Sequence, residues 1–535
     1  MKKLDKALAV CMASLLLFGS FKSGVSAAAS APSLPFDDIR SSFAKDEIVE
    51  LVKEGVVEGT GYRTFEPKKN VTRAEFVAMT DRLFKLEPVN ANMASFHDVA
   101  AKSWYYSWVE AAVQLEIVDG KSKTEFMPTA KITRQEAAVL IVRAMKVDPG
   151  NRTANDLPYA DANQVASWAA PYVLAARSLG LMDGAGGKFR PKDAMSREET
   201  AAVLDRVLKD KVWSKAIHQP TNLGLQLGWQ NGLTTSQFQE KIKNSNVNTL
   251  IPRWFFLESA QVPVSNYADS GLIAWAKQNN KKIWAMLGNH SDSALTHQIL
   301  SDTSKRKTVI QKLTSYVKAY GLSGINVDFE NVSPEDRLPL TAFISELGTS
   351  LRGAGAVLSI DVSPDLGTDW TEAFDYEALG RYADYVILMG YDEHWDGDPL
   401  AGSVSSFPWV ESALNRMLSV VPASKTILAL PYYTRDWTLK SGGAVSEELS
   451  LIQQGQRMRS VYYNREWDEQ LGQYVVSYIR QGYEHRIWVE DGRSLGLKTM
   501  MAVKRGVAGF AYWYIGAETE DLWTSLSNAT RYASY

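Results

Sequence analysis

Two carboxylic acids in one short apolar run are the residues of this sequence best suited to acid–base chemistry. Asp328 and Glu330 stand two positions apart, and Asn326 precedes them by two, within residues 324–331. Alternate side chains of a β-strand share a face, so these three polar groups should point the same way. A neighbouring negative charge raises the proton affinity of a carboxyl, so we expect Glu330 to be held protonated as a general acid. A pair of acids satisfied by loop amides is the alternative.

Eight short apolar runs, separated by segments long enough for helices, are the elements that would position this pair. Runs such as 250–257 and 385–389 lack clean alternation, as expected of parallel strands covered on both faces. The pattern predicts an α/β fold, a (β/α)8 (TIM) barrel, with a doubly wound sheet as the alternative. Chemistry in such a barrel belongs at the C-terminal ends of the strands, where Glu330 falls. The predicted strands are residues 222–230, 248–257, 281–289, 324–332, 357–364, 385–393, 426–434 and 507–516.

The segment around the acids resembles glycoside hydrolase family 18, whose fourth strand carries D-G-x-D-x-D-x-E. Residues 323–330 read SGINVDFE, so the final acid pair is kept while Ser323 and Asn326 replace the first two Asp. The resemblance covers about residues 222–520. It implies that Glu330 is the catalytic acid and that Asp328 orients and polarises the substrate's acetamido group. Family 18 is substrate-assisted, so no metal and no organic cofactor is expected.

Later strands carry further matches to the same family. Residues 389–392 read M-G-Y-D, which implies that Tyr391 hydrogen-bonds the acetamido oxygen and that Asp392 touches the sugar. Trp513 falls where the family places the indole floor of the cleaved sugar's subsite. Aromatic residues after the strands could stack on sugar faces, with ordinary core packing as the alternative. The predicted substrate-binding residues are Asn326, Met389, Asp392, Trp513, Tyr432, Trp254 and Trp395.

Local stretches narrow the resemblance to spore-cortex and cell-wall N-acetylglucosaminidases. They are residues 326–332, 391–395, 430–435 and 487–491. An Asn at position 326 is at home in that branch, although Ser323 still leaves the family's carboxylate relay one member short. The stretch between the seventh and eighth predicted strands is too long for one crossover helix. It predicts a small α+β insertion that forms one wall of the cleft.

The N-terminal third contains a threefold internal repeat. An F-x-P motif recurs at Phe65, Phe126 and Phe189, and each copy is followed by a hydroxyl residue, an Arg and a Glu at 72–75, 133–136 and 196–199. A hydroxyl residue with Glu three positions on is a capping box, which marks the start of a helix. Each unit is therefore predicted to be a helix, a loop and a second helix. The first helix of each unit is predicted to close at Gly59, Gly120 or Gly184.

These units resemble the S-layer homology (SLH) domain over about residues 34–210. The resemblance implies a pseudo-threefold assembly that binds the pyruvylated secondary cell-wall polymer of Gram-positive cells. An Arg in the first turn of a helix, with the positive helix N-terminus, suits a ketal carboxylate. Ion pairs between these arginines and neighbouring acids are the alternative. The predicted polymer-binding residues are Asp38, Arg73, Asp98, Arg134, Asp161 and Arg197.

The first residues predict export. Three lysines precede the apolar run 7–21, and small residues follow at 25–27, so residues 1–28 are predicted to be a signal peptide. The apolar run is too short to span a bilayer, and no membrane span is expected in the mature chain. Cys11 is the single cysteine, and its removal would leave no thiol; lipid attachment at Cys11 is the alternative. With 58 Lys plus Arg against 61 Asp plus Glu, the charge gives no argument for nucleic-acid binding.

These observations predict a secreted glycoside hydrolase associated with the cell wall or S-layer. Its substrate would be a β-linked glycan containing N-acetylglucosamine, with peptidoglycan favoured. A surface-displayed chitinase and a non-catalytic glycan-binding S-layer protein are the alternatives. The predicted order is a signal peptide (1–28), three SLH domains (34–90, 91–152 and 153–212) and a family 18 barrel (213–535).

Overall fold

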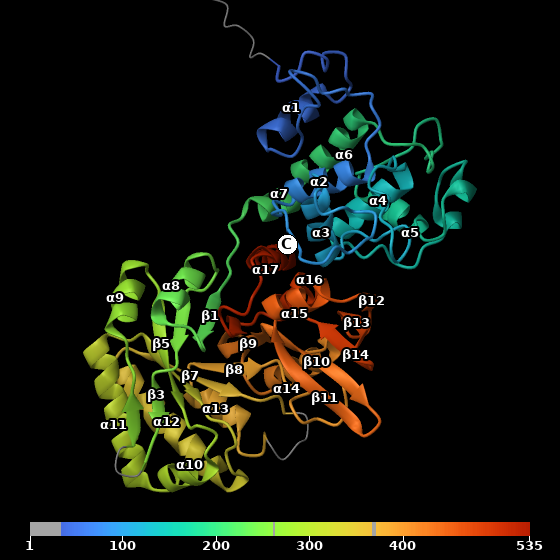
Figure 1. The fold of residues 1–535 in the computed structure, drawn as a ribbon. Helices are drawn as coiled ribbons and strands as arrows, with labels where there is room; N and C mark the ends of the chain where they lie inside the picture. Colours follow the sequence, from blue (N-terminus) through green and yellow to red (C-terminus); the bar gives the residue numbers. More distant parts are fainter. Residues whose placement is uncertain (1–33, 260–262, 366–370) are drawn as a thin grey trace, which may run out of the picture.

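The protein has an N-terminal helical part and a C-terminal barrel (Figure 1). The computed structural model describes residues 34–259, 263–365 and 371–535. The predicted signal peptide lies outside the described residues. Within those ranges no helix is both long and apolar enough to cross a membrane.

The helical part is built from three two-helix units, as the repeat predicts. Every second helix begins with the predicted capping box: the Thr72, Thr133 and Ser196 side chains accept from the backbone N–H three residues on, and the Glu at that position accepts from the cap residue's N–H. These reciprocal bonds satisfy helix N–H groups that have no partner inside the helix. The helices are α1 (Lys45–Lys53), α2 (Arg73–Leu83), α3 (Tyr106–Gln114), α4 (Arg134–Ala144), α5 (Ala170–Ser178) and α6 (Arg197–Lys209).

The three repeated glycines do not close the first helices, so that prediction is wrong. The helices α1, α3 and α5 end several residues earlier. Each glycine instead lies where a loop passes close to an aromatic ring, and a Cβ at Gly59 would stand 2.6 Å from the Phe36 ring. The same close approach occurs at Gly120, next to Phe96, and at Gly184, next to Tyr159.

The predicted (β/α)8 barrel is confirmed. Eight parallel strands pair in the order β2-β1-β15-β9-β8-β7-β6-β5, and pairing of β2 with β5 closes the barrel. Every predicted strand range contains one of them. After β2, a hairpin of β3 (Phe255–Leu257) and β4 (Val264–Asn266) pairs with the end of β5 through β3. The barrel strands are β1 (Leu225–Gln230), β2 (Thr249–Pro252), β5 (Lys282–Gly288), β6 (Gly324–Asp328), β7 (Val357–Val362), β8 (Tyr385–Met389), β9 (Thr426–Pro431) and β15 (Gly509–Trp513).

Two apolar layers hold the barrel in shape. An inner layer fills the barrel and includes Trp229, Trp284 and Met286. A larger outer layer lies between the strands and the surrounding helices, and includes Ile325, Val327 and Phe329 of the acid-bearing segment. The helices are α8 (Thr235–Lys243), α9 (Ser270–Gln278), α10 (Ser293–Leu300), α11 (Thr303–Tyr320), α12 (Arg337–Gly353), α13 (Tyr376–Tyr382), α14 (Phe407–Leu418), α16 (Gly492–Lys504) and α17 (Asp521–Ser534).

A five-stranded antiparallel sheet and the helix α15 lie between β9 and α16. The sheet has the order β11-β10-β14-β13-β12. Its polar centre is Asp436, whose carboxylate accepts hydrogen bonds from Arg457 and Tyr478 and contacts His485 Nδ1 at 2.9 Å. The elements are β10 (Tyr433–Lys440), β11 (Gly443–Ser450), α15 (Leu451–Arg459), β12 (Tyr463–Asp468), β13 (Gln473–Arg480) and β14 (Tyr483–Val489).

The helical part packs directly on the barrel's last two helices, α16 and α17, beside α3 (Figure 1). Tyr532 and Met500 lie in the hydrophobic core of the helical part. The chain then forms α7 (Lys211–His218), whose Ile217 is buried in that same core. We call this contact the joint.

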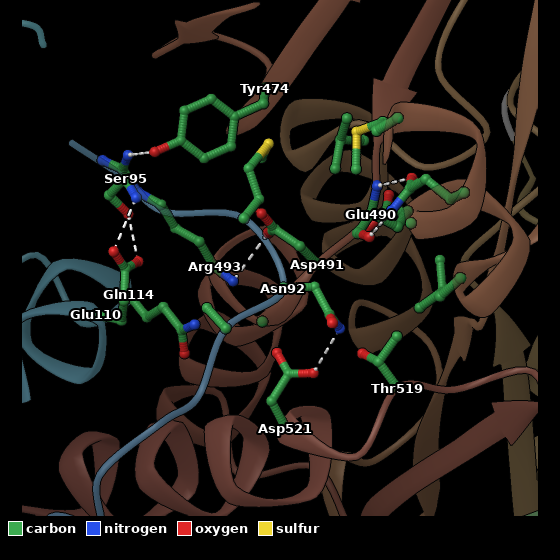
Figure 2. Close-up of a pocket in the computed structure, with 18 residues that line it drawn as sticks. Asn92, Ser95, Glu110, Gln114, Tyr474, Glu490, Asp491, Arg493, Thr519 and Asp521 are labelled. Carbon is green, nitrogen blue, oxygen red and sulfur yellow. Dashed lines mark hydrogen bonds between the residues drawn. The ribbon is translucent and has the colours of Figure 1, made fainter. Parts of the chain in front are cut away.

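A small cavity of about 30 Å³ lies at the joint. Figure 2 shows that its polar residues come from both parts: Glu110 accepts from Ser95, and Arg493 donates to the Tyr474 hydroxyl. Burial raises the pKa of Glu110 to about 7, although the Ser95 hydrogen bonds oppose the shift. The cavity therefore belongs to the packing between the two parts.

Candidate active site

Asn326 and Asp328 of β6 share one face with Glu330, which lies two residues beyond the end of the strand, as predicted. Asn326 is fully buried inside the barrel, Asp328 is half-buried, and Glu330 is exposed at the mouth. The alternate residues pack outward, and Phe329 stacks on Phe343 of α12 at 5.9 Å. The alternation of the strand thus delivers two carboxyl groups to the opening of the barrel.

A third carboxyl group joins this pair from the neighbouring strand. The Asn326 amide donates to Asp361 Oδ1 of β7 at 2.8 Å and to Ser359 Oγ at 3.1 Å, and its Oδ1 accepts from Trp229 Nε1 at 3.3 Å. Asp361 is buried. The sequence analysis missed it, although the alternation of Ser359 and Asp361 with apolar residues in β7 was a usable signal.

Burial and mutual repulsion decide which carboxyl holds a proton. Burial, followed by the Glu330 charge, raises the pKa of Asp328 to about 7, while the Arg253 charge lowers it. Burial and the Asp328 charge also raise the pKa of Asp361 well above its ordinary value. The acid pair in the sequence predicts the extra proton on Glu330. In the structure, burial raises the proton affinity of the deeper carboxyl groups, Asp328 and Asp361.

The loop after β5 fixes the position of Glu330. Ser291 Oγ donates to Glu330 Oε2 at 2.7 Å. The Asn289 side chain binds both backbone groups of Glu330. Its Oδ1 accepts from the Glu330 N–H at 3.1 Å, and its Nδ2 donates to the Glu330 carbonyl at 2.8 Å. The sequence analysis did not single out Asn289 and Ser291, which reach Glu330 only through the pairing of β5 with β6.

The end of β8 brings Tyr391 and Asp392 to the same opening. Tyr391 is buried in the inner layer, and burial together with the Asp361 and Asp328 charges raises its pKa well above its ordinary value. Its hydroxyl therefore stays protonated and can act as a donor. The Tyr433 hydroxyl donates to Asp392 Oδ1, and the Tyr433 ring lies edge-on to Tyr391 at 6.0 Å.

Two further predicted residues line the barrel interior. Met389 and Trp513 are partly buried against the inner layer. Trp513 lies edge-on to Trp229 at 5.8 Å between ring centroids, at the end of β15. The structure thus brings Asn326, Asp328, Glu330, Met389, Tyr391, Asp392 and Trp513 to one barrel and its mouth.

The prediction that Tyr432 binds substrate is wrong. Tyr432 is fully buried in the outer layer, where it stacks on Tyr512 at 5.1 Å and lies edge-on to Trp523. Strand alternation turns it outward and turns Tyr433 toward the cleft. Trp254 is 5% exposed and packs mainly in the outer layer, while Trp395 is 54% exposed on the loop after β8.

The six residues predicted to bind wall polymer make structural contacts within and between the helical units. Each Arg is nearly buried over the Phe ring of another unit, as Arg73 is over Phe126, and donates through Nε to that residue's carbonyl. Each Asp accepts from two backbone N–H groups of its own unit. These contacts engage the Nε of each Arg and both carboxylate oxygens of each Asp. Binding of wall polymer by Asp38, Asp98, Asp161, Arg73, Arg134 and Arg197 stays a prediction.

The family profile of glycosyl hydrolases family 18 matches residues 232–518. The chain belongs to this family. The S-layer homology domain matches three times, at residues 35–77, 95–138 and 158–201. The protein is therefore a family 18 glycoside hydrolase whose S-layer homology domains attach it to the cell surface.

Curated relatives match the family 18 part. An uncharacterized glycosylase, YvbX of Bacillus subtilis, is 27% identical over 58% of this chain and 92% of its own length. The cortical fragment-lytic enzyme of the same organism is 26% identical over 48% of this chain. The chain spans 62% of the length of that enzyme.

Solved structures share the fold. The spore cortex-lytic enzyme SleL of Bacillus cereus has a TM-score of 0.53 and 22% identity, over 58% of this chain and 75% of its own. A chitinase from Chromobacterium violaceum has a TM-score of 0.52 and 24% identity, over 57% and 98%. At 22% and 24% sequence identity, these two structures show that the fold is shared and no more.

Proposed function

We propose that this family 18 enzyme hydrolyses a β-linked glycan containing N-acetylglucosamine at the cell wall, with peptidoglycan as its main substrate. The observation that carries the proposal is the line of carboxyl groups from Asp361 through Asp328 to Glu330, with the Tyr391 hydroxyl beside it. A proton held by this line and a donor next to it are what substrate-assisted cleavage needs.

The reaction begins when Glu330 delivers the proton shared with Asp328 to the glycosidic oxygen, which leaves Asp328 ionised. The substrate's own acetamido oxygen attacks the anomeric carbon, so the protein needs no second carboxylate as nucleophile. Asp328 accepts from the acetamido N–H, and the Tyr391 hydroxyl donates to the acetamido oxygen, which aligns it for attack. Glu330 then takes a proton from water as the water opens the oxazolinium ion. The attack by the acetamido oxygen and the attack by water each invert the anomeric carbon, so the product retains the β configuration.

Peptidoglycan is the favoured substrate because attachment to the cell surface through the S-layer homology domains would bring the barrel to the wall. The relatives that include a cortical fragment-lytic enzyme support the same choice. Chitin is the second candidate, supported by the fold shared with a chitinase. The intact Glu330 argues against a glycan-binding protein without catalysis.

The proposed anchor is the set of three S-layer homology units, after export directed by residues 1–28. Phe43, Trp104 and Trp168 occupy equivalent positions in the three units and are each more than half exposed. These rings can stack on sugar faces, so we place the contact with pyruvylated wall polymer at them. Trp104→Ala should weaken sedimentation of the full chain with purified walls, whereas an unchanged bound fraction would exclude Trp104 from the contact.

Mass spectrometry of digestion products tests the proposed activity. Purified peptidoglycan and chitin oligosaccharides are incubated separately with the wild type and with Glu330→Gln. We expect the wild type to release peptidoglycan fragments that end in reducing N-acetylglucosamine. Glu330→Gln should release none, and the exposed control Glu335→Gln should release them as the wild type does. Chitobiose from chitin alone would favour the chitinase alternative, and binding without products would favour the non-catalytic one.

A further inference from the structure

A cavity adjoins the catalytic acid at the C-terminal ends of β1 and β2. Its volume of about 480 Å³ lies within the range of pockets that hold small molecules. The wall of the cavity leads directly to Glu330: His290 stacks on Phe256 at 4.4 Å, and the next residue, Ser291, donates to Glu330. A sugar in this cavity would therefore be a neighbour of the sugar at Glu330.

The break between β2 and β3 supplies the cavity with one guanidinium. β2 ends at Pro252 and β3 begins at Phe255, so Arg253 leaves the strand at the barrel mouth. Arg253 is exposed, donates through Nη1 to Asn231 Oδ1 at 2.8 Å and extends over the Phe256 ring at 5.7 Å. Among the described residues no carboxylate lies within ion-pair distance of it.

The acidic residue of the cavity wall does not neutralise Arg253. The Asp269 carboxylate caps α9, where it accepts from the N–H groups of Gly271 and Leu272 and from the Thr235 hydroxyl. The remaining walls include the rings of Trp254, Phe256, Tyr267 and His290. The cavity thus offers aromatic ring faces and one guanidinium. Only Nη1 of that guanidinium donates to another described residue, so its other N–H groups can bind a ligand.

We propose that this cavity is a subsite for a carboxylate-bearing sugar next to the N-acetylglucosamine that is cleaved. The inference rests on the proposed function and defines its substrate class. A guanidinium fork matches a planar carboxylate, and aromatic rings match a sugar face. A glycan in which N-acetylglucosamine alternates with N-acetylmuramic acid presents such a carboxylate, either on the free lactyl ether or on an attached peptide. An uncharged homopolymer of N-acetylglucosamine presents none.

The test compares the full chain with its Arg253→Gln variant on three substrates. They are peptide-free glycan strands, the same strands with carboxylates converted to neutral amides, and intact peptidoglycan. The wild type should prefer charged over amidated strands by about tenfold or more in kcat/KM, as expected for a charge-assisted hydrogen bond. Arg253→Gln should bring that ratio near one. Arg253 also acts on the pKa of Asp328, but this effect is common to all three substrates and cancels in the ratio.

Lys277→Gln is the matched control, because it removes one exposed positive charge from α9 without touching the cavity. It should keep the wild-type ratio. If the wild type cleaves intact peptidoglycan faster than peptide-free strands, and Arg253→Gln cleaves both at the same rate, then the carboxylate that Arg253 binds lies on the peptide. Equal wild-type rates on charged and amidated strands, or an Arg253→Gln variant that keeps the preference, would overturn the subsite and leave the proposed function standing.

Calorimetry separates failure of the subsite from failure of the enzyme. If the wild type cleaves none of the three substrates, the proposed function fails. Binding of the same strands to Glu330→Gln and to Glu330→Gln/Arg253→Gln still tests the subsite. Weaker binding of charged strands to the double variant supports it, and equal binding overturns it.

Discussion

At the scale of residues, the carboxyl group with the raised pKa, Asp328, is not the one proposed to protonate the substrate, Glu330. Asp328 is desolvated and faces the Glu330 charge, so its pKa rises to about 7, whereas Glu330 is exposed and accepts from Ser291. Coupled carboxyl groups titrate as a unit, so the proton is a property of the pair. Glu330 can act as the acid only while the pair retains that proton.

The pH dependence of kcat/KM follows from this coupling. Because the raised pKa of Asp328 is about 7, the free enzyme loses the shared proton as the pH rises through that value, and kcat/KM should fall above it. The positive charge of Arg253 lowers this pKa, so Arg253→Gln should move the alkaline limb to higher pH. Rates on uncharged chitin oligosaccharides between pH 5 and pH 9 measure the shift. A limb that stays in place or moves to lower pH would contradict the assignment.

The sequence identified the residues whose roles depend on one strand, because alternation alone places Asn326, Asp328 and Glu330 on one face. It missed Asp361, because that contact depends on the pairing of β6 with β7. It also selected Tyr432 rather than Tyr433, since both residues follow the end of β9 at Pro431 and the motif does not show which ring turns inward. The alternation within β7 could have singled out Asp361, but no pattern within one strand shows that it meets Asn326 of β6.

At the scale of elements, the repeated glycines serve close approach in the loops of the helical units. A Cβ at Gly59 would lie 2.6 Å from the Phe36 ring and 2.8 Å from the Thr64 carbonyl oxygen, whereas a Cβ at Gly61 would meet nothing within 4 Å. Gly59→Ala should therefore destabilise the helical part by about 1–3 kcal/mol, the usual cost of overpacking. Gly61→Ala should change its stability by less than about 0.5 kcal/mol. Thermal unfolding of both variants checks this, and equal melting temperatures would contradict it.

The segment 487–491, which resembles wall-lytic relatives, has a structural role at Glu490. Glu490 and Lys498 are fully buried and joined at 2.6 Å, and Glu490 also accepts from Ser494 and Gln473. These contacts tie the end of β14 to α16 and to β13. The motif thus joins the inserted sheet to the barrel.

Lys498→Met should be strongly destabilising, by about 3–5 kcal/mol, because it leaves the Glu490 charge buried without a counter-charge. Adding Glu490→Gln should recover much of that loss, since no charge then remains buried. Chemical unfolding of the single and double variants measures both effects. Lys504→Met, at an exposed position of the same helix, is the control and should match the wild type. A double variant less stable than the single one would refute this explanation.

At the scale of the whole molecule, the joint fixes the direction in which the barrel faces the wall anchor. Lys146, after α4, donates to the carbonyl groups of Tyr532, Ala533 and Tyr535 at the end of α17. The Asn528 side chain pairs with the backbone of Glu87 in both directions. The sequence predicted both parts from their patterns, but not this contact, because no motif spans it.

Loss of Lys146 should loosen the joint. Lys146→Met leaves carbonyl groups at the end of α17 without their donor, at a cost of about 1–3 kcal/mol. Hydrogen exchange at the joint, in α3 and α17, should then be roughly tenfold faster, while exchange in the barrel strands stays unchanged. The exposed substitution Lys192→Met should leave exchange at wild-type rates, and an unaltered joint in Lys146→Met would count against its role.

The central claim is that the substrate's acetamido group replaces a protein nucleophile while Glu330 serves as the acid. Proton NMR of freshly released products from a glycan containing N-acetylglucosamine tests it most directly, because the anomeric signal shows the configuration before mutarotation. The account predicts the β anomer first, with no product from Glu330→Gln and none from a de-N-acetylated substrate. An α anomer as the first product, or turnover without the acetamido group, would contradict it.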